Sequence, residues 1–169
     1  MKNIETNKGF KNLKPISGRT LENIMQSKNS IYLTDEKEIL LEINNMISGL
    51  SKNTNLFIGI IDESAALKIL NDTGINVFNY RVSYNKSDVM HWYKRHVLNT
   101  ANRIQMKMND LLKFIDLLNN YNKISIGFDY GGNKAIQLYG YYEGSMLCIA
   151  ILSAGRNKIT FKTMYYIEK

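Results

Sequence analysis

The chain has 169 residues, of which 44% are hydrophobic and 22% are charged, a composition typical of a folded globular protein and not of a disordered chain. No apolar run approaches the roughly 18 to 20 residues that cross a bilayer, and the first residues lack the apolar core of a cleaved signal peptide. Cys148 is the only cysteine, which excludes a disulfide framework and a cysteine-based zinc site.

The net charge is +7, and most of the excess lies in the second part of the chain. The excess is +2 up to Asn55 and +5 from Leu56 onward. A basic surface favours a polyanionic partner, which means nucleic acid, an anionic membrane face or an acidic protein. Charge alone does not choose among these partners.

The first 55 residues contain one strong helix signal. Residues 1 to about 17 are polar and hold the single proline, so we expect an extended leader, followed by a short helix over residues 20–27. Asp35 then provides a helix cap, and apolar residues at helical spacing predict an amphipathic helix that ends near Gly49. The polar segment Ser51–Asn55 marks a boundary. We therefore predict an accessory N-terminal helical segment (1–55) and a main domain (56–169).

The main domain begins with short elements. Leu56–Ile61 is an apolar run that predicts a buried strand, and residues 65–70 predict a helix closed by Gly74. The alternation over residues 80–84 predicts an extended segment. A further helix is expected over residues 111–118.

The last third of the chain changes to strand periodicity. Four segments rich in Ile, Tyr, Phe and Thr are separated by glycine-containing turns: 123–129, 134–142, 145–153 and 158–167. They predict a four-stranded antiparallel β-meander, with the apolar third strand in its interior. Because helices precede the meander and no β-α-β alternation is visible, the sequence predicts the α+β class.

Both histidines and the only tryptophan fall in the segment Val89–His96. The preceding Ser87-Asp88 pair is a helix start signal, so we place the segment on a helix. At helical spacing His96 points inward with the apolar stripe, whereas His91 lies at its edge beside Arg95. Two interpretations stay open at this point. His96 can be a hydrogen-bonded core residue with His91 solvated, or the two imidazoles can share acid–base chemistry.

The order of several motifs resembles a known family. IGIIDESAALKILNDTGINV comes first, then the H-x-x-x-x-H helix at His91 and His96, then NDLLKFIDLL and the terminal ITFKTMYY. Over Leu56 to Lys169 this order resembles the phage-associated nuclease toxins of the barnase, EndoU, colicin tRNase and RelE (BECR) superfamily. Such domains occur at the C-termini of MuF-type phage head proteins and of polymorphic toxins. The resemblance implies a helix packed on a four-stranded antiparallel sheet, and metal-independent RNA cleavage in which the ribose 2′-hydroxyl attacks the adjacent phosphate.

Such a reaction needs a base, an acid and groups that stabilise the phosphorane. We expect His91 and His96 to be the catalytic acid and base, because an ordinary imidazole titrates near neutral pH. Thr163 and Tyr165 share a strand face, so their hydroxyls can hold phosphate oxygens, although cross-strand packing is the simpler role for both.

The candidate substrate-binding residues are the cations Arg95, Arg156, Lys158 and Lys162. Strict strand alternation places Lys158, Thr160 and Lys162 on one face and puts Thr163 with Tyr165 on the other. Lys162 therefore joins the two hydroxyls only if a β-bulge brings it round.

The leading hypothesis is a metal-independent endoribonuclease toxin without a cofactor. It would act in the cytoplasm of a bacterial target or host cell after delivery by a phage particle or a secretion system. Its partners would be RNA, with tRNA as one candidate, and an acidic immunity or inhibitor protein, with no role for a membrane. The alternative is a basic RNA- or protein-binding phage module with a degenerate active site. A third hypothesis, an ADP-ribosyltransferase effector, lacks a nucleotide-binding signature or catalytic Glu motif in the sequence.

Overall fold

The computed structural model describes residues 13–99, 101, 104–142 and 146–168. Its α-helices are α2 (Gly18–Gln26), α3 (Glu36–Ile47), α4 (Glu63–Thr73), α5 (Lys86–Trp92) and α6 (Lys113–Asn120). A π-helical turn (Tyr93–Val97) continues α5, and a 3-10 helix (Met108–Leu112) leads into α6. The strands are β1 (Leu13–Lys14), β2 (Ser30–Tyr32), β3 (Asn55–Ile61), β4 (Arg81–Asn85), β5 (Lys123–Phe128), β6 (Lys134–Tyr142), β7 (Met146–Gly155) and β8 (Lys158–Glu168).

The helices form where the sequence predicts them. The Asp35 side chain caps α3 by accepting from the Glu38 N–H, as the capping preference of Asp predicts. α4 ends at Gly74, whose φ of 79° is the left-handed conformation that glycine adopts most readily. Most of the predicted leader lies outside the described residues. Its described part is residues 13–17, which begins with β1.

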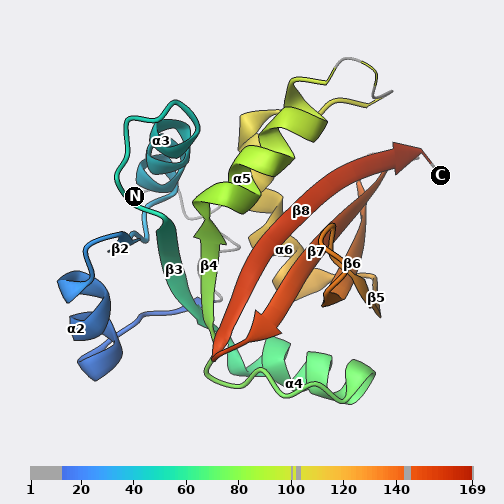
Figure 1. Ribbon diagram of the computed structural model, residues 1–169. Helices are drawn as coiled ribbons and strands as arrows, with labels where there is room; N and C mark the ends of the chain where they lie inside the picture. The colour runs from blue at the N-terminus through green and yellow to red at the C-terminus, as the bar shows by residue number, and fades with distance from the viewer. Residues whose placement is uncertain (1–12, 100, 102–103, 143–145, 169) are drawn as a thin grey trace, which may run out of the picture.

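The described strands form one eight-stranded sheet in the order β1-β3-β4-β8-β7-β6-β5, with β2 paired to β3 (Figure 1). This mixture of helices and sheet confirms the α+β class. The four-stranded sheet predicted from the sequence is wrong in extent. β5 to β8 do pair as antiparallel neighbours in chain order, but β4 adds to β8 in parallel and continues the sheet to β3. The expected absence of β-α-β units is also wrong, because β2, α3 and parallel β3 form one. Short strands between helices carry too little periodicity to reveal their partners.

A β-bulge interrupts β8. Ile151 of β7 pairs with Thr163 and the next residue, Leu152, pairs with Phe161, so Lys162 is an extra residue without a partner in β7. Phe161 and Met164 are both buried in the main core, although strict alternation would put them on opposite faces. The bulge therefore turns both residues between them away from the core. The bulge is the condition under which the sequence allows Lys162 to share a face with Thr163 and Tyr165, and the structure meets it.

The main core lies on one face of the sheet, against α3, α5 and α6 (Figure 1). An aromatic group occupies its centre, where Tyr84, Phe114 and Phe161 pack with ring centroids 5.4 to 5.7 Å apart. Trp92 of α5 meets Phe161 edge-on at 6.3 Å. α5 is thereby anchored to β8 and lies beside it along the sheet.

No helix in the described part of the chain is both long enough and apolar enough to span a bilayer.

The division at residues 55 and 56 stays a proposal, but the packing of α3 bears on it. Ile39, Ile43 and Met46 of α3 are fully buried in the same hydrophobic cluster as the sheet and α5. A fragment from Asn55 to Lys169 would expose the surface that these side chains cover. Burial of each such side chain stabilises a fold by about 1.5 to 3 kcal/mol.

We expect the fragment Asn55–Lys169 to keep a cooperative thermal transition but to melt well below the full chain. A control fragment that begins at Ser30 retains β2 and α3, and it should melt close to the full chain. Differential scanning calorimetry of the three proteins measures this. A fragment from Asn55 without any cooperative transition would place α3 in the indispensable core and overturn the proposed boundary.

Candidate active site

The histidine segment is helical, as predicted, and its start is fixed by a cap. The Asn85 side chain accepts a hydrogen bond from the Ser87 N–H at 3.0 Å, at the point where β4 passes into α5. Trp92 is fully buried, so the side of α5 that faces the core is centred nearer to Trp92 than the sequence predicts. The π-helical turn then widens the helix and changes the phase of the residues after Trp92. His96 is consequently half-buried at the surface of the sheet.

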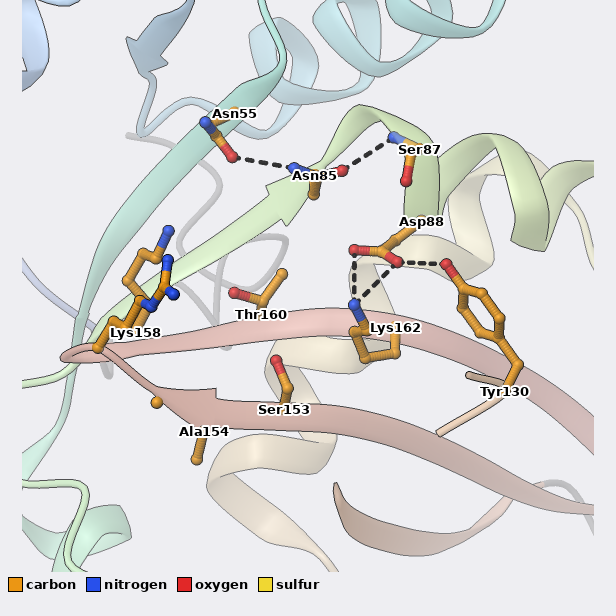
Figure 2. Close-up of a pocket in the computed structure, with 12 residues that line it drawn as sticks. Asn55, Asn85, Ser87, Asp88, Tyr130, Ser153, Ala154, Lys158, Thr160 and Lys162 are labelled. Atoms are coloured by element: carbon orange, nitrogen blue, oxygen red, sulfur yellow. Dashed lines mark hydrogen bonds and ion pairs between the residues drawn. The ribbon is translucent and has the colours of Figure 1, made fainter. Parts of the chain in front are cut away.

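A buried carboxylate joins α5 to two other elements. Asp88 is only 3% exposed, and its Oδ1 lies 3.1 Å from the Lys162 ammonium on the bulge of β8. The same oxygen accepts a hydrogen bond of 2.6 Å from the hydroxyl of Tyr130, in the turn between β5 and β6 (Figure 2). Burial and this hydrogen bond raise the pKa of Tyr130 to about 12, so the phenol stays protonated and donates.

Tyr130 also supports the first histidine. The imidazole of His91 stacks on the Tyr130 ring with centroids 3.8 Å apart and planes 13° from parallel. Burial, and then the positive charge of Arg95, lower the pKa of His91 below its ordinary value, while Asp88 opposes the shift. His91 is therefore held flat and mostly neutral at pH 7.

The second histidine lies over the C-terminal part of β8. His96 stacks on Tyr165 with centroids 5.5 Å apart. Burial, Arg95 and His91 together lower the pKa of His96 to about 4. Burial keeps the Tyr165 hydroxyl protonated by raising its pKa.

Thr163 lies between Lys162 and Tyr165 on the face opposite the core. It is 6% exposed, and its hydroxyl has no hydrogen-bond partner among the described residues. A buried hydroxyl without a partner is unfavourable, and such groups in folded proteins call for an explanation.

The remaining predicted cations line a pocket of about 420 Å³ over the junction of β4 and β8, which we name the β4–β8 pocket (Figure 2). Arg156 and Lys158 lie at its β7–β8 turn, and Lys162 and Tyr130 form the end that meets the histidines. Hydroxyl and amide groups line the rest: Asn55, Asn85, Ser87, Ser153 and Thr160. The pocket and the histidine site are thus continuous through Tyr130 and Lys162.

The structure thereby brings most of the predicted residues to one surface in two adjoining groups. We call His91, His96, Thr163 and Tyr165 the histidine group: His96 stacks on Tyr165, Thr163 lies on the same outer face of β8, and His91 lies five residues before His96. Arg156, Lys158 and Lys162 form the pocket group, with Lys162 shared between the two.

Sequence reasoning missed Asp88 and Tyr130 as site residues. Asp88 is three residues before His91, and on a helix this spacing makes the two side chains neighbours. The sequence therefore contained a signal that could have identified Asp88. Nothing local signals Tyr130, because its contact with Asp88 joins residues 42 apart in the chain.

The described residues contain no group of three or more His, Cys, Asp or Glu side chains arranged to hold a metal ion. Cys148 is buried in the core, and burial raises the pKa of its thiol to about 12. The thiol is therefore unreactive at neutral pH, as its place in an apolar strand predicts.

The fold defines a class of protein: an α+β domain with one extended sheet, whose outer face carries hydroxyls and cations near two histidines. A family model described as phage-Barnase-EndoU-ColicinE5/D-RelE like nuclease 3 matches residues 59–169. The chain therefore belongs to this nuclease family, and the resemblance drawn from its motifs is confirmed. Comparisons with curated proteins and with solved structures found no match.

The Asp88–Lys162 pair provides a test of this arrangement. We expect Lys162→Met to destabilise the fold by roughly 3 kcal/mol, because it leaves the buried Asp88 carboxylate without its cation. The double variant Asp88→Asn/Lys162→Met should recover most of that loss, since neither remaining side chain is charged. Urea unfolding of the two single variants and the double variant measures the coupling. Additive effects would contradict a buried, coupled pair.

Proposed function

We propose that the protein is a metal-independent endoribonuclease in which His91 and His96 act as general base and general acid. The single observation that supports this most strongly is that both imidazoles are held by stacking on tyrosine rings, His91 on Tyr130 and His96 on Tyr165, next to the cation Lys162. RNA is the favoured substrate because its 2′-hydroxyl supplies an internal nucleophile. The protein then needs only to move protons and stabilise charge.

In this mechanism a neutral imidazole removes the proton from the ribose 2′-hydroxyl, whose oxygen attacks the adjacent phosphorus. The bond from phosphorus to the 5′-oxygen then breaks, and a protonated imidazole gives its proton to that leaving oxygen. The products are a 2′,3′-cyclic phosphate and a free 5′-hydroxyl. His91 is the more exposed imidazole and suits the base, whereas half-buried His96, held on Tyr165, suits the acid.

The charged phosphorane needs donors. Thr163 and Tyr165 offer hydroxyls on the same face, and both are protonated groups that can donate to a phosphate oxygen. Lys162 offers a cation beside Thr163 because of the bulge. Arg95 lies close enough to lower both histidine pKa values, and a bound phosphate would offset its charge.

We further propose that this activity makes the protein a toxin of the bacterial cytoplasm, with tRNA as one candidate target and with delivery by a phage particle or a secretion system. The net charge of +7 favours an acidic protein as the inhibitor, since the same basic face that attracts RNA would attract carboxylates. Sequencing the RNA ends that appear after induction in cells would identify the target. The alternative function, a binding module without catalysis, is favoured if the protein binds RNA and leaves it intact.

The histidines provide the first test of catalysis. We expect His91→Ala and His96→Ala each to reduce cleavage of a single-stranded RNA by roughly 100-fold or more, the usual effect of losing a general acid or base. Thr163→Val keeps the β-branched shape and removes only the hydroxyl, so it should reduce cleavage while the melting temperature stays the same or rises. His91→Gln is a control for the stacking contact, because it keeps a planar polar side chain beside Tyr130 but cannot transfer a proton. Near-normal cleavage by both histidine variants would remove them from the mechanism.

The pH dependence follows from the lowered histidine pKa values. A base must be neutral and works above its pKa, whereas an acid must be protonated and works below its pKa. Both free imidazoles titrate below the ordinary value of 6.5, so kcat/KM should be greatest below pH 6.5. A bound phosphate favours the protonated imidazoles and raises both pKa values, so the maximum of kcat should lie at higher pH. A kcat/KM that keeps rising above pH 8 would exclude this pair.

We expect cleavage to survive an excess of EDTA, because the proposed proton transfers and charge stabilisation use protein side chains alone. The measurement compares initial rates with and without the chelator at constant ionic strength, since salt itself weakens RNA binding. Loss of cleavage that one divalent ion restores would replace the mechanism with a metal-assisted one.

A further inference from the structure

The β4–β8 pocket has features of a binding site that the cleavage mechanism does not use. Its volume of about 420 Å³ lies in the range of pockets that take small organic molecules, and a single nucleotide is of that size. It opens on the same face as the histidines and shares Lys162 and Tyr130 with them. Whatever occupies the pocket therefore lies next to the reacting phosphate.

The charges of the pocket favour an anion. Three cations line it, and the one carboxylate in its lining, Asp88, is already paired with Lys162. Neither the Arg156 guanidinium nor the Lys158 ammonium forms an ion pair with a described residue. Lys158 lies at the end of the pocket away from Tyr130 (Figure 2), and Arg156 lies in the turn just before it, so an uncompensated positive charge is left at that turn. A phosphate group fits this end.

The backbone conformation of Arg156 adds a second observation. Arg156 and Asn157 form the two-residue turn between β7 and β8, with φ of 54° and 61°. Such a turn favours Asn or Gly at both positions, and a left-handed arginine costs about 1 kcal/mol. Asn157 follows this preference and Arg156 does not. The unfavourable conformation thus places an arginine side chain in the lining of the pocket.

The middle of the pocket carries neutral hydrogen-bonding groups. Ser153 and Thr160 are directly paired across β7 and β8, so their hydroxyls lie side by side on the pocket floor. The Ser153 hydroxyl has no hydrogen-bond partner among the described residues, whereas Thr160 lies 3.3 Å from the Ser83 hydroxyl. On the wall, Asn85 donates to the Asn55 side chain at 3.1 Å. Such fixed neutral groups recognise the edge of a nucleobase, as in single-stranded RNA recognition.

From these features we infer that the β4–β8 pocket binds the single nucleotide next to the cleaved phosphodiester and selects its base. Arg156 and Lys158 hold the outer phosphate of that nucleotide. Ser153 and Thr160 hydrogen-bond to the base, while Tyr130 and Lys162 separate it from the reacting phosphate. This inference rests on the proposed function for the identity of the ligand, but the binding that it predicts is measurable without cleavage.

The experiment titrates the full wild-type chain with each of the four ribonucleoside 5′-monophosphates and with inorganic phosphate, by calorimetry. These probes contain no phosphodiester, so the enzyme does not consume them. We expect one nucleotide to bind at least about 10-fold more tightly than the other three and than phosphate, because mismatched bases leave pocket groups unpaired. Equal affinities for all five probes, or no binding, would overturn the inference.

Three variants separate the roles of the pocket groups. The double variant Ser153→Ala/Thr160→Val should abolish the base preference, with about 10-fold weaker binding of the preferred nucleotide and unchanged phosphate binding. Arg156→Asn should weaken all four nucleotides by about 10-fold without lowering the melting temperature, because Asn tolerates the left-handed turn. Lys134→Ala, a cation outside the pocket, is the matched control and should change neither property. Full affinity in both pocket variants would contradict the assignment.

The same base should appear beside the cut when wild-type protein cleaves a random single-stranded RNA and the ends are sequenced. Cleavage without any base preference, together with no selective nucleotide binding, would contradict the binding role inferred for the pocket and leave the proposed function intact. Selective nucleotide binding without RNA cleavage would support the binding role of the pocket and contradict the proposed function. The two failures are therefore distinguishable.

Discussion

The arrangement of the site depends on one buried charge. The Asp88 carboxylate is almost fully removed from water, which is unfavourable unless a cation and hydrogen-bond donors replace the solvent. Lys162 and Tyr130 provide them, from positions 74 and 42 residues away along the chain. A shift of α5 along β8, or of the β5–β6 turn over the sheet, would separate these groups and leave a charge unpaired. One electrostatic requirement thus holds a helix, a strand and a turn in a single relative position.

The bulge in β8 brings Thr163 and Tyr165 to the same face as Lys162 of this pair. In a regular strand, the side chain after Phe161 would lie on the outer face and the next one in the core. The extra residue puts Lys162 and Thr163 on the outer face together, and Met164 returns to the core. A cation, a hydroxyl and the Tyr165 ring consequently lie in sequence beneath the histidine helix. A β-bulge that redirects side chains beside a functional site is a common use of this irregularity.

Local patterns predicted most of the elements but not the contacts between them. Helix caps at Asp35 and Gly74 and the apolar alternation of the last strands depend on neighbouring residues, so the sequence displays them. The parallel pairing of β4 with β8 depends on chain segments about 75 residues apart, and no short-range rule encodes it. The histidines, hydroxyls and cations were chosen for their chemistry, and their roles stay predictions. Tyr130 was missed because its role arises only when a distant turn lies against α5.

The histidines also show how a basic site can remain ready for an anionic substrate. Arg95 and partial burial disfavour a proton on either imidazole, so the free site does not add two further positive charges to a surface that is already basic. An incoming phosphate reverses both effects, because its negative charge favours the protonated imidazoles. The substrate thus supplies the electrostatic partner that lets one histidine carry a proton while the other stays neutral. The proposed assignment of the two roles rests on their differing burial: His91 is more exposed, whereas His96 is covered by β8 and Tyr165. In the proposed mechanism, these unequal environments divide the acid and base roles between two chemically identical side chains.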